Sequence, residues 1–144
     1  MTIRDIARPR EELVSATKET PVTELATMMR ERTVGSVVIE ERGKPIGIVT
    51  DRDLAMKIVA AGKNPRDLTA ADVMNGNTIT VDADDGVFDV CRTMRESGVR
   101  RVPVMDNGEL AGILTLDDII VLLEDELHDL SEVIRSESPP YALP

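Results

Sequence analysis

Aromatic residues are almost absent from this sequence. Its 144 residues include one phenylalanine, one tyrosine and no tryptophan. A folded core must therefore be aliphatic, and an apolar content of 42% is enough to build one. The length fits a single domain or two small halves that pack closely together.

Cysteine and histidine are also scarce, with one residue of each. A single cysteine excludes an intrachain disulfide and a cysteine-based metal cluster, and it is typical of a cytoplasmic protein. Cys91 falls on the apolar stripe of an expected helix, which favours a small buried core residue over a reactive thiol. His128 falls on the polar side of a late helix, which favours a solvated surface residue over a catalytic base.

Positive charge and long apolar runs are lacking as well. Lysine and arginine number 17 against 27 aspartate and glutamate residues, for a net charge of −10. This balance argues against nucleic acid or an anionic membrane as the main partner. No apolar run approaches transmembrane length, and residues 1–10 lack the apolar segment of a signal peptide, so we expect a cytoplasmic protein. The acidic run at 124–126 indicates a solvated helix face, because adjacent helical carboxylates alone do not satisfy Mg²⁺.

The main positive feature of the sequence is an internal repeat. Residues 47–53 (GIVTDRD) and 112–118 (GILTLDD) begin 65 residues apart, and the same offset aligns the residues before them without a gap. One small unit has therefore been duplicated. We expect a first unit with its lead-in segment at 1–70, a second unit at 71–130, and the end of a helix with a flexible tail at 131–144.

Hydrophobic periodicity and turn residues predict strand, helix, strand, strand, helix in both units, which is an α/β (α+β) fold. In the first unit the expected elements are a strand at 13–16, a helix at 21–32 capped by Thr20, a hairpin at 36–41 and 44–50, and a helix at 51–61. In the second unit they are a strand at 78–81, a helix with an apolar stripe over 87–94, a hairpin at 102–105 and 109–115, and a helix from 116. Arg42-Gly43 and Asn107-Gly108 are the expected hairpin turns.

The last helix is expected to run on beyond its counterpart. Its apolar residues follow heptad spacing of 4, 3, 4, 3 and 4, at Leu116, Ile120, Leu123, Leu127, Leu130 and Ile134. Beyond residue 126 nothing in its own unit is left to cover this seam. We therefore expect it to pack against another subunit, and folding back onto the first unit is the alternative.

Each copy of the repeated stretch places a hydroxyl and a carboxylate at a strand-to-helix junction. Thr50 and Thr115 can cap the helices that follow, and Asp53 and Asp118 lie one turn later on the same side. A carboxylate that accepts two hydrogen bonds suits a diol such as ribose, and a helix N-terminus suits an anion. A single copy is better explained as a cap with an acid that complements the helix dipole. Two copies in one register favour a ligand.

The doubled unit, with its two G-apolar-apolar-T-x-x-D stretches, resembles a tandem pair of CBS domains (cystathionine β-synthase type), also called a Bateman module. Residues 98–104 (GVRRVPV) are similar to the second-strand motif of that family, and residues 72–74 (DVM) to the lead-in of a repeat. The resemblance covers about residues 5 to 125. It implies two repeats packed with pseudo-two-fold symmetry, two clefts between them that bind adenosine-containing ligands, and modules that pair through their helices.

Carried over by position, the resemblance assigns roles to ten residues. Asp53 and Asp118 would accept ribose hydroxyls, and Thr50 and Thr115 would contact ribose or phosphate. The adenine would lie beside Ile48, Ile79 and Ile113. The basic pair that often reaches phosphates, with the proline of its motif, would be Arg100, Arg101 and Pro103.

The first repeat departs from this pattern, which makes the two clefts inequivalent. It has Gly35-Ser36 in place of Arg100-Arg101 and Val38 in place of Pro103. Arg52 could also reach a phosphate, and the alternative for it is a surface ion pair with a neighbouring acid.

The resemblance implies a regulatory sensor that binds AMP, ADP, ATP or S-adenosylmethionine and transmits occupancy to a homodimer or to a separate regulated protein. No cofactor is required, although Mg²⁺ could accompany a nucleotide. The alternative is a structural dimerisation or interaction module with unoccupied clefts. We do not expect an enzyme, because no nucleophile and base pair and no metal-ligand cluster is visible.

Overall fold

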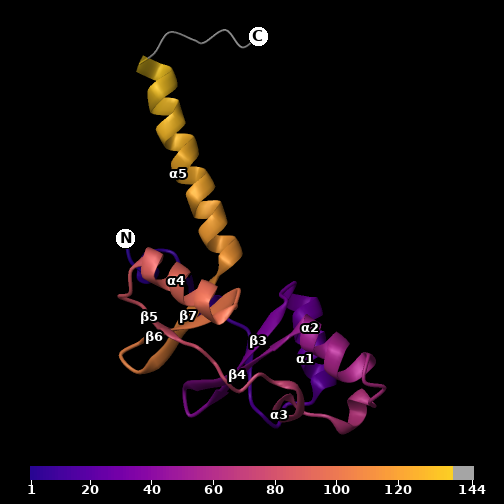
Figure 1. Ribbon diagram of the computed structural model, residues 1–144. Helices are drawn as coiled ribbons and strands as arrows, with labels where there is room; N and C mark the ends of the chain where they lie inside the picture. The colour runs from indigo at the N-terminus through magenta and orange to yellow at the C-terminus, as the bar shows by residue number, and fades with distance from the viewer. Residues whose placement is uncertain (138–144) are drawn as a thin grey trace, which may run out of the picture.

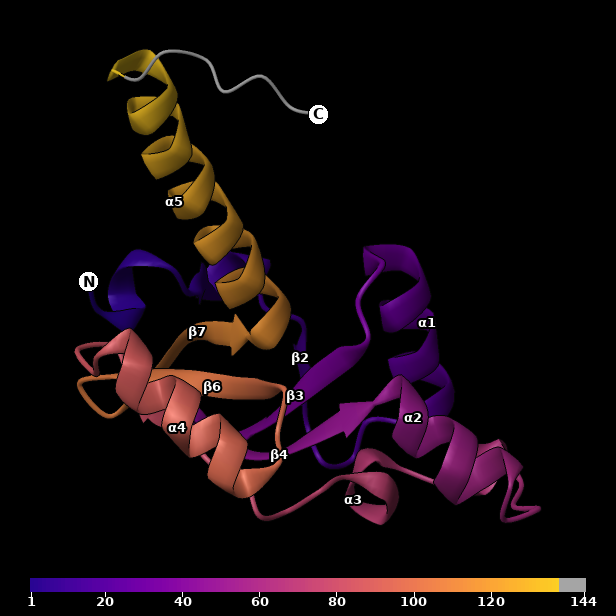
Figure 2. The ribbon, with the colours of Figure 1, turned by 45° about the horizontal axis from the view of Figure 1, so that its top comes forward.

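The computed structural model describes residues 1–137. Most of the predicted flexible tail, residues 138–144, lies outside the described residues. The described chain forms two small β-sheets that lie side by side, each with helices along one face, and a long last helix that leads away from them (Figures 1 and 2).

The first sheet has the strand order β2-β3-β4. It consists of β2 (Ser15–Ala16), β3 (Ser36–Glu41) and β4 (Lys44–Thr50), with β2 parallel and β4 antiparallel to β3. The predicted hairpin turn is confirmed, because Arg42 and Gly43 both have positive φ, at 54° and 76°.

Two helices cover the first sheet, and one predicted cap is wrong. Helix α1 (Val22–Arg32) begins one residue later than expected, after Pro21. Thr20 does not cap it, because its hydroxyl accepts a hydrogen bond from the Thr17 N–H (3.1 Å) within the preceding turn. Helix α2 (Asp51–Leu54) follows β4 directly and continues through a single π turn, η3 (Ala55–Val59).

The second sheet repeats the first and adds one strand, in the order β1-β7-β6-β5. Strands β5 (Val81–Asp82), β6 (Arg101–Asp106) and β7 (Glu109–Thr115) correspond to β2, β3 and β4, and β1 (Arg8–Pro9) pairs with the free edge of β7. The strand predicted at 78–81 is wrong over 78–80: β5 begins at Val81, and residues 78 and 79 line a cleft. Helix α4 (Val87–Ser97) carries the predicted apolar stripe, and Val87, Val90 and Met94 are buried.

A short lead-in segment precedes each repeat in the sequence, and each lead-in segment packs on the other repeat. The short helices η1 (Ile3–Asp5) and α3 (Ala70–Val73) both start with a Thr–Asp capping box. Ile3 is fully buried in the core of the second repeat, whereas Ala70 and Val73 are buried in the core of the first. Backbone hydrogen bonds follow the same exchange: Ile3 N–H donates to Asp85, and Ala70 N–H donates to Thr20.

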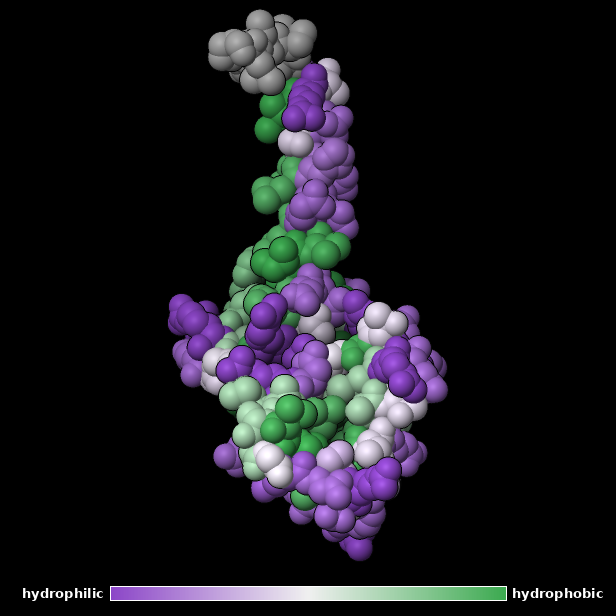
Figure 3. Space-filling view, turned by 90° about the vertical axis from the view of Figure 1, so that its right-hand side faces the viewer, coloured by the Kyte–Doolittle hydropathy of each residue, from purple (hydrophilic) through white to green (hydrophobic). Residues whose placement is uncertain are grey.

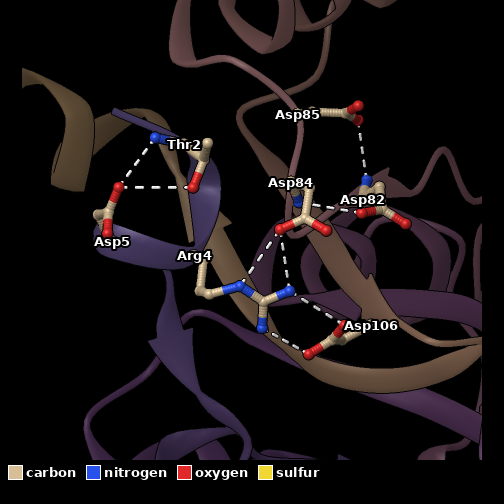
Figure 4. A network of polar contacts seen from close by, with 7 residues as sticks. All are labelled: Thr2, Arg4, Asp5, Asp82, Asp84, Asp85 and Asp106. Atoms are coloured by element: carbon tan, nitrogen blue, oxygen red, sulfur yellow. Dashed lines mark hydrogen bonds and ion pairs between the residues drawn. The ribbon is translucent and has the colours of Figure 1, made fainter.

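Polar contacts hold the first lead-in segment on the second repeat (Figure 4). The guanidinium of Arg4 donates to Asp84 (3.0 and 3.3 Å) and to Asp106 (2.6 and 3.1 Å). These bonds raise the pKa of Arg4 and lower that of Asp106. All three side chains are partly exposed. We therefore expect these ion pairs to orient the lead-in segment and to add little to the stability of the fold.

A third apolar cluster joins the two sheets. It contains buried Val38 from β3 and buried Leu110 and Ile113 from β7, with Leu13, Ile48 and Met105 packed against it. The two repeats therefore share one interface, and each end of that interface is open to the surface at a cleft. The division of the chain near residue 70 follows the sequence repeat and stays a prediction.

Helix α5 (Leu116–Glu137) is the long last helix that the heptad spacing predicts. Only Ile119 in it is buried. The helix leads away from both sheets, so the predicted alternative of folding back onto the first repeat does not occur over the described residues (Figures 1 and 2).

The close passage of the first lead-in segment over β7 gives a testable consequence. A Cβ at Gly112 would overlap the backbone carbonyl of Arg8, which cannot move without breaking the β1–β7 pairing. We expect Gly112→Ala to lower the free energy of unfolding by about 2 kcal/mol or more, measured by urea denaturation. Gly76→Ala is the matched control, because a Cβ there meets nothing within 4 Å. Equal stability of the two variants would contradict this account of the packing.

Candidate functional site

Two clefts lie between the repeats, at positions related by the 65-residue offset. The first cleft, of about 300 Å³, is lined by Ile48 and Thr50 of the first repeat and by Ile79, Arg100 and Arg101 of the second. The second cleft, of about 210 Å³, is lined by the corresponding Ile113 and Thr115, and by Val14, Gly35 and Ser36. The pseudo-two-fold symmetry of the repeats therefore extends to their clefts.

At the first cleft, Thr50 and Asp53 form a capping box at the start of α2. The Asp53 N–H donates to the Thr50 hydroxyl (3.1 Å), and the Asp53 carboxylate accepts from the Thr50 N–H (2.9 Å) and hydroxyl (3.0 Å). This is the capping role that the sequence left open as the simpler explanation. It holds the carboxylate in one orientation, with 8% of the residue exposed.

Two further side chains contact the Asp53 carboxylate. The Asn75 amide donates to both carboxylate oxygens (3.0 and 3.2 Å), and Lys57 Nζ lies 3.3 Å from Oδ1. Burial by itself would raise the pKa of Asp53, but the hydrogen bonds from Thr50, Asn75 and Lys57 outweigh it and lower the pKa. The residue is therefore a carboxylate at neutral pH, and Asn75 donates to it twice, as a diol would.

At the second cleft, a charged group takes the place of Asn75. The Arg8 guanidinium donates to Asp118 at 2.9, 3.0 and 3.2 Å, and the Thr115 hydroxyl donates to the same carboxylate at 2.8 Å. Burial would raise the pKa of Asp118, but the bonds from Arg8 and Thr115 lower it overall. Asp118 is therefore neutralised by an ion pair within the chain.

Arg8 and Asn75 are equivalent residues of the two lead-in segments. The capping boxes at Thr2 and Thr69 lie 67 residues apart, and the same offset places Arg8 on Asn75. The first repeat therefore has two additional residues between its lead-in and its first strand. Aligning the two repeats at an offset of 65 residues does not place Arg8 on Asn75. The 67-residue spacing of the two Thr–Asp capping boxes is the sequence signal that could have revealed their equivalence.

The clefts also differ in charge. Arg52, Asn77 and Arg100 line the first cleft, where the second has Asp117, Glu12 and Gly35. Each of these differences makes the first cleft more positive.

Arg101 lines both clefts. It can do so because its guanidinium lies over Gly35, where a Cβ would come within 3.1 Å of Nη2. The residue of the first repeat that corresponds to Arg101 is Ser36, so the first repeat supplies no equivalent arginine to the clefts.

Seven of the ten residues assigned by resemblance line a cleft in this structure: Ile48, Thr50, Ile79, Arg100, Arg101, Ile113 and Thr115. Within residues 1–137, Asp53, Asp118 and Pro103 do not. Asp53 lies behind Asn75 and Asp118 behind Arg8, whereas Pro103 is buried in β6 opposite Ile113. Arg52 lines the first cleft, and it was considered for this role from the sequence.

Comparison with known proteins decides the family. Residues 3–60 and 70–125 each match the family described as CBS domain. The chain belongs to the CBS domain family. The two matches coincide with the two sequence repeats. Each match begins at the short helix that precedes its repeat in the sequence, η1 or α3.

Several CBS domain relatives cover most of the chain. An uncharacterized protein MK0525 of Methanopyrus kandleri is 40% identical over 141 residues, which is 92% of this chain and 71% of that protein. Hypoxic response protein 1 of Mycobacterium tuberculosis is 33% identical over 123 residues, 85% of each chain.

Solved structures of similar fold include two with bound groups. The CBS domain pair of protein MJ0100 in complex with 5′-methylthioadenosine and S-adenosyl-L-methionine has a TM-score of 0.77 and 28% identity, covering 88% of this chain and 98% of that one. Hypoxic Response Protein I with two coordinated zinc ions has a TM-score of 0.72 and 34% identity, covering 83% and 97%.

Residues 1–137 contain no group of three or more His, Cys, Asp or Glu side chains placed to hold a metal ion. None of the helices in that part of the chain has the length and apolarity needed to cross a membrane.

The ion pair at the second cleft predicts a pH-dependent contribution to stability. Because the pKa of Asp118 is lowered in the folded state, its contribution is present above about pH 4 and is lost as the pH falls below that value. We expect Arg8→Ala to cost about 1 kcal/mol at pH 7, since Arg8 is half exposed and solvent screens the pair. Urea unfolding at pH 7, 5 and 3 should show the cost shrinking toward pH 3.

Arg92→Ala is the control for this measurement, because Arg92 and Asp89 form an exposed pair at 3.4 Å. It should change stability little at any of these pH values. A penalty for Arg8→Ala that is as large at pH 3 as at pH 7 would show that packing, and not charge, is what Arg8 supplies.

Proposed function

We propose that the chain is a regulatory sensor that binds a phosphorylated adenosine ligand in the first cleft. One observation supports this most strongly: directly behind the cleft wall, a fixed carboxylate accepts two hydrogen bonds from a lining amide that a ligand could displace, and arginines line the other repeat's side. Asp53 and Asn75 form the first part, and Arg100 and Arg101 form the second. These are the groups that a ribose diol and a phosphate need.

Asn75 can be exchanged for a ribose more easily than Arg8 can. Asn75 is neutral and exposed, and its two bonds to Asp53 can be replaced by two hydroxyl donors without leaving a charge unpaired. At the second cleft the same exchange would break an ion pair between Arg8 and a carboxylate that is largely shielded from solvent. We therefore expect one phosphorylated ligand per chain.

The walls of the first cleft suit a flat heterocycle. Ile48 and Ile79 come from opposite repeats, and Val99 adds a third aliphatic side chain. A volume of about 300 Å³ lies at the lower end of the range for small-molecule sites. Aliphatic surfaces on both sides allow an adenine to be buried without any aromatic residue.

The related CBS domain pair in complex with 5′-methylthioadenosine and S-adenosyl-L-methionine supports the adenosyl part of this proposal. The arginines of the first cleft favour an anionic ligand over those two, so we expect AMP, ADP or ATP to bind more tightly. In the second cleft, an uncharged adenosyl compound is the ligand class that its lining would accept once Arg8 moves.

A ligand in the first cleft would contact both repeats at once. Its ribose would bind the first repeat, and its phosphates would bind the second. Such a ligand stabilises whichever relative orientation of the repeats it fits best, which is how occupancy could be transmitted to a partner. We infer regulation and not catalysis, because Thr50 and Asp53 bond to each other and provide no free base for a nucleophile.

A panel of AMP, ADP, ATP, NAD, adenosine and S-adenosylmethionine tests the proposal by thermal shift and by titration calorimetry. At a concentration 100-fold above Kd, a ligand should stabilise the protein by about 2.7 kcal/mol. We expect the strongest response from AMP, ADP or ATP, with one site per chain. No response to any adenosine compound would overturn the proposal.

Arg100→Ala tests the phosphate end of the site. Loss of one charge-assisted contact in an exposed setting should weaken ADP or ATP binding about tenfold. Adenosine binding should stay unchanged, since it has no phosphate. Arg95→Ala, on exposed α4 outside the cleft, is the matched control and should bind all ligands normally. Equal losses for adenosine and ADP would place Arg100 outside the phosphate site.

A second function is favoured by a separate observation. The apolar seam of α5 is exposed, which suits a dimerisation or interaction module whose clefts stay unoccupied. That function predicts no thermal shift with nucleotides, and it predicts that Arg100→Ala leaves the association of the chain unchanged.

A further inference from the structure

The six seam residues of α5 are all exposed, although they are large and apolar. Their exposed fractions are 37% at Leu116, 57% at Ile120, 44% at Leu123, 67% at Leu127, 62% at Leu130 and 61% at Ile134. In Figure 3 hydrophobic surface lies along one side of the long helix, and hydrophilic surface lies along the other. A helix of this kind is marginal in water without a packing partner.

We propose that α5 pairs with α5 of a second copy as a parallel two-stranded coiled coil. The heptad places Ile120, Leu127 and Ile134 at positions a and the three other leucines of the seam at positions d. Among parallel coiled coils, isoleucine at a with leucine at d favours two strands. Two of the three a residues are isoleucine and all d residues are leucine, so this composition favours two strands over three or four.

The flanking charges distinguish parallel from antiparallel pairing. In a parallel pair, each g residue faces the e residue five positions later in the partner, so Glu126 faces Ser131 of the partner. The earlier g residue, Ile119, is buried in the core of its own repeat, so Glu124 of the partner meets no like charge there. In the antiparallel register that pairs all six seam residues, e faces e and g faces g. Glu124 then opposes Glu124 of the partner, and Glu126 opposes Glu126 of the partner. Like charges in direct opposition disfavour that arrangement.

Apolar surface next to the seam extends the proposed interface. A hollow of about 410 Å³ between α4 and α5 is lined by Phe88, Leu122 and Leu123. Phe88 is 81% exposed and is the only aromatic residue within the part of the chain that the structure describes. A partner helix packed on Leu123 would also cover Phe88, which makes the contact larger than the seam alone.

The charge of α5 makes the expected association salt-dependent. The helix carries eight acidic residues and one arginine, so two copies repel each other at low ionic strength. The dimer dissociation constant should therefore fall as salt rises. A basic partner helix of another protein would show the opposite dependence, since salt would weaken its attraction to α5.

Sedimentation of the full chain at 50 and 500 mM salt tests the self-association. We expect dimers that tighten with salt, and at least tenfold weaker association for Leu127→Asp. His128→Asp is the matched control, because it adds the same side chain at the neighbouring position outside the seam, and it should remain dimeric. A wild-type chain that stays monomeric at about 100 µM in both salts would overturn the proposal.

Disulfide trapping tests the direction of pairing without destabilising the helix. In a Cys91→Ser background, Leu130→Cys alone should form a disulfide-linked dimer, since parallel pairing places this d position opposite itself. Asp125→Cys, on the outer face, should not. Cross-linking only when Leu130→Cys and Ile120→Cys chains are mixed would show antiparallel pairing and overturn the proposal. Neither measurement uses a nucleotide, so its outcome is independent of the function proposed for the clefts.

Discussion

The exchange of lead-in segments is the constraint on which the rest of this structure depends. Ile3 completes the core of the second repeat, and Ala70 and Val73 complete the core of the first. Each segment then passes across the edge strand of that other repeat at a glycine, Gly112 or Gly47, where a Cβ would collide with it. Each repeat needs the segment that precedes the other repeat to complete its core, so we expect the two to fold as one unit with the clefts between them.

The same segments make the two clefts chemically different. They deliver Asn75 to one carboxylate and Arg8 to the other, because both residues follow the short helix that is docked on the opposite repeat. A difference between a neutral amide and a guanidinium decides whether the carboxylate remains available to a ligand. With Gly35-Ser36 in the first repeat where the second has Arg100-Arg101, it leaves two related clefts that differ in charge.

A hydrogen bond links the first cleft to the start of the long helix. The backbone N–H of Leu116, the first residue of α5, donates to the carbonyl of Arg100 (2.8 Å). The arginine that faces the proposed phosphate site and the helix proposed for dimerisation therefore share one junction. Under both proposals, this hydrogen bond connects the phosphate end of the cleft to the first turn of α5.

The sequence by itself determined the duplicated architecture, the two hairpins and the exposed seam of α5, because alternation, glycine turns and heptad spacing are local patterns. Seven of the ten residues that it assigned to the site also line a cleft, since they lie next to recognisable strand ends. Only the tertiary structure decided which groups bond to Asp53 and Asp118. Their partners, Asn75 and Arg8, are 22 and 110 residues away along the chain and are brought there by the exchanged segments. No local pattern encodes such a contact, because it depends on how one repeat packs against the other.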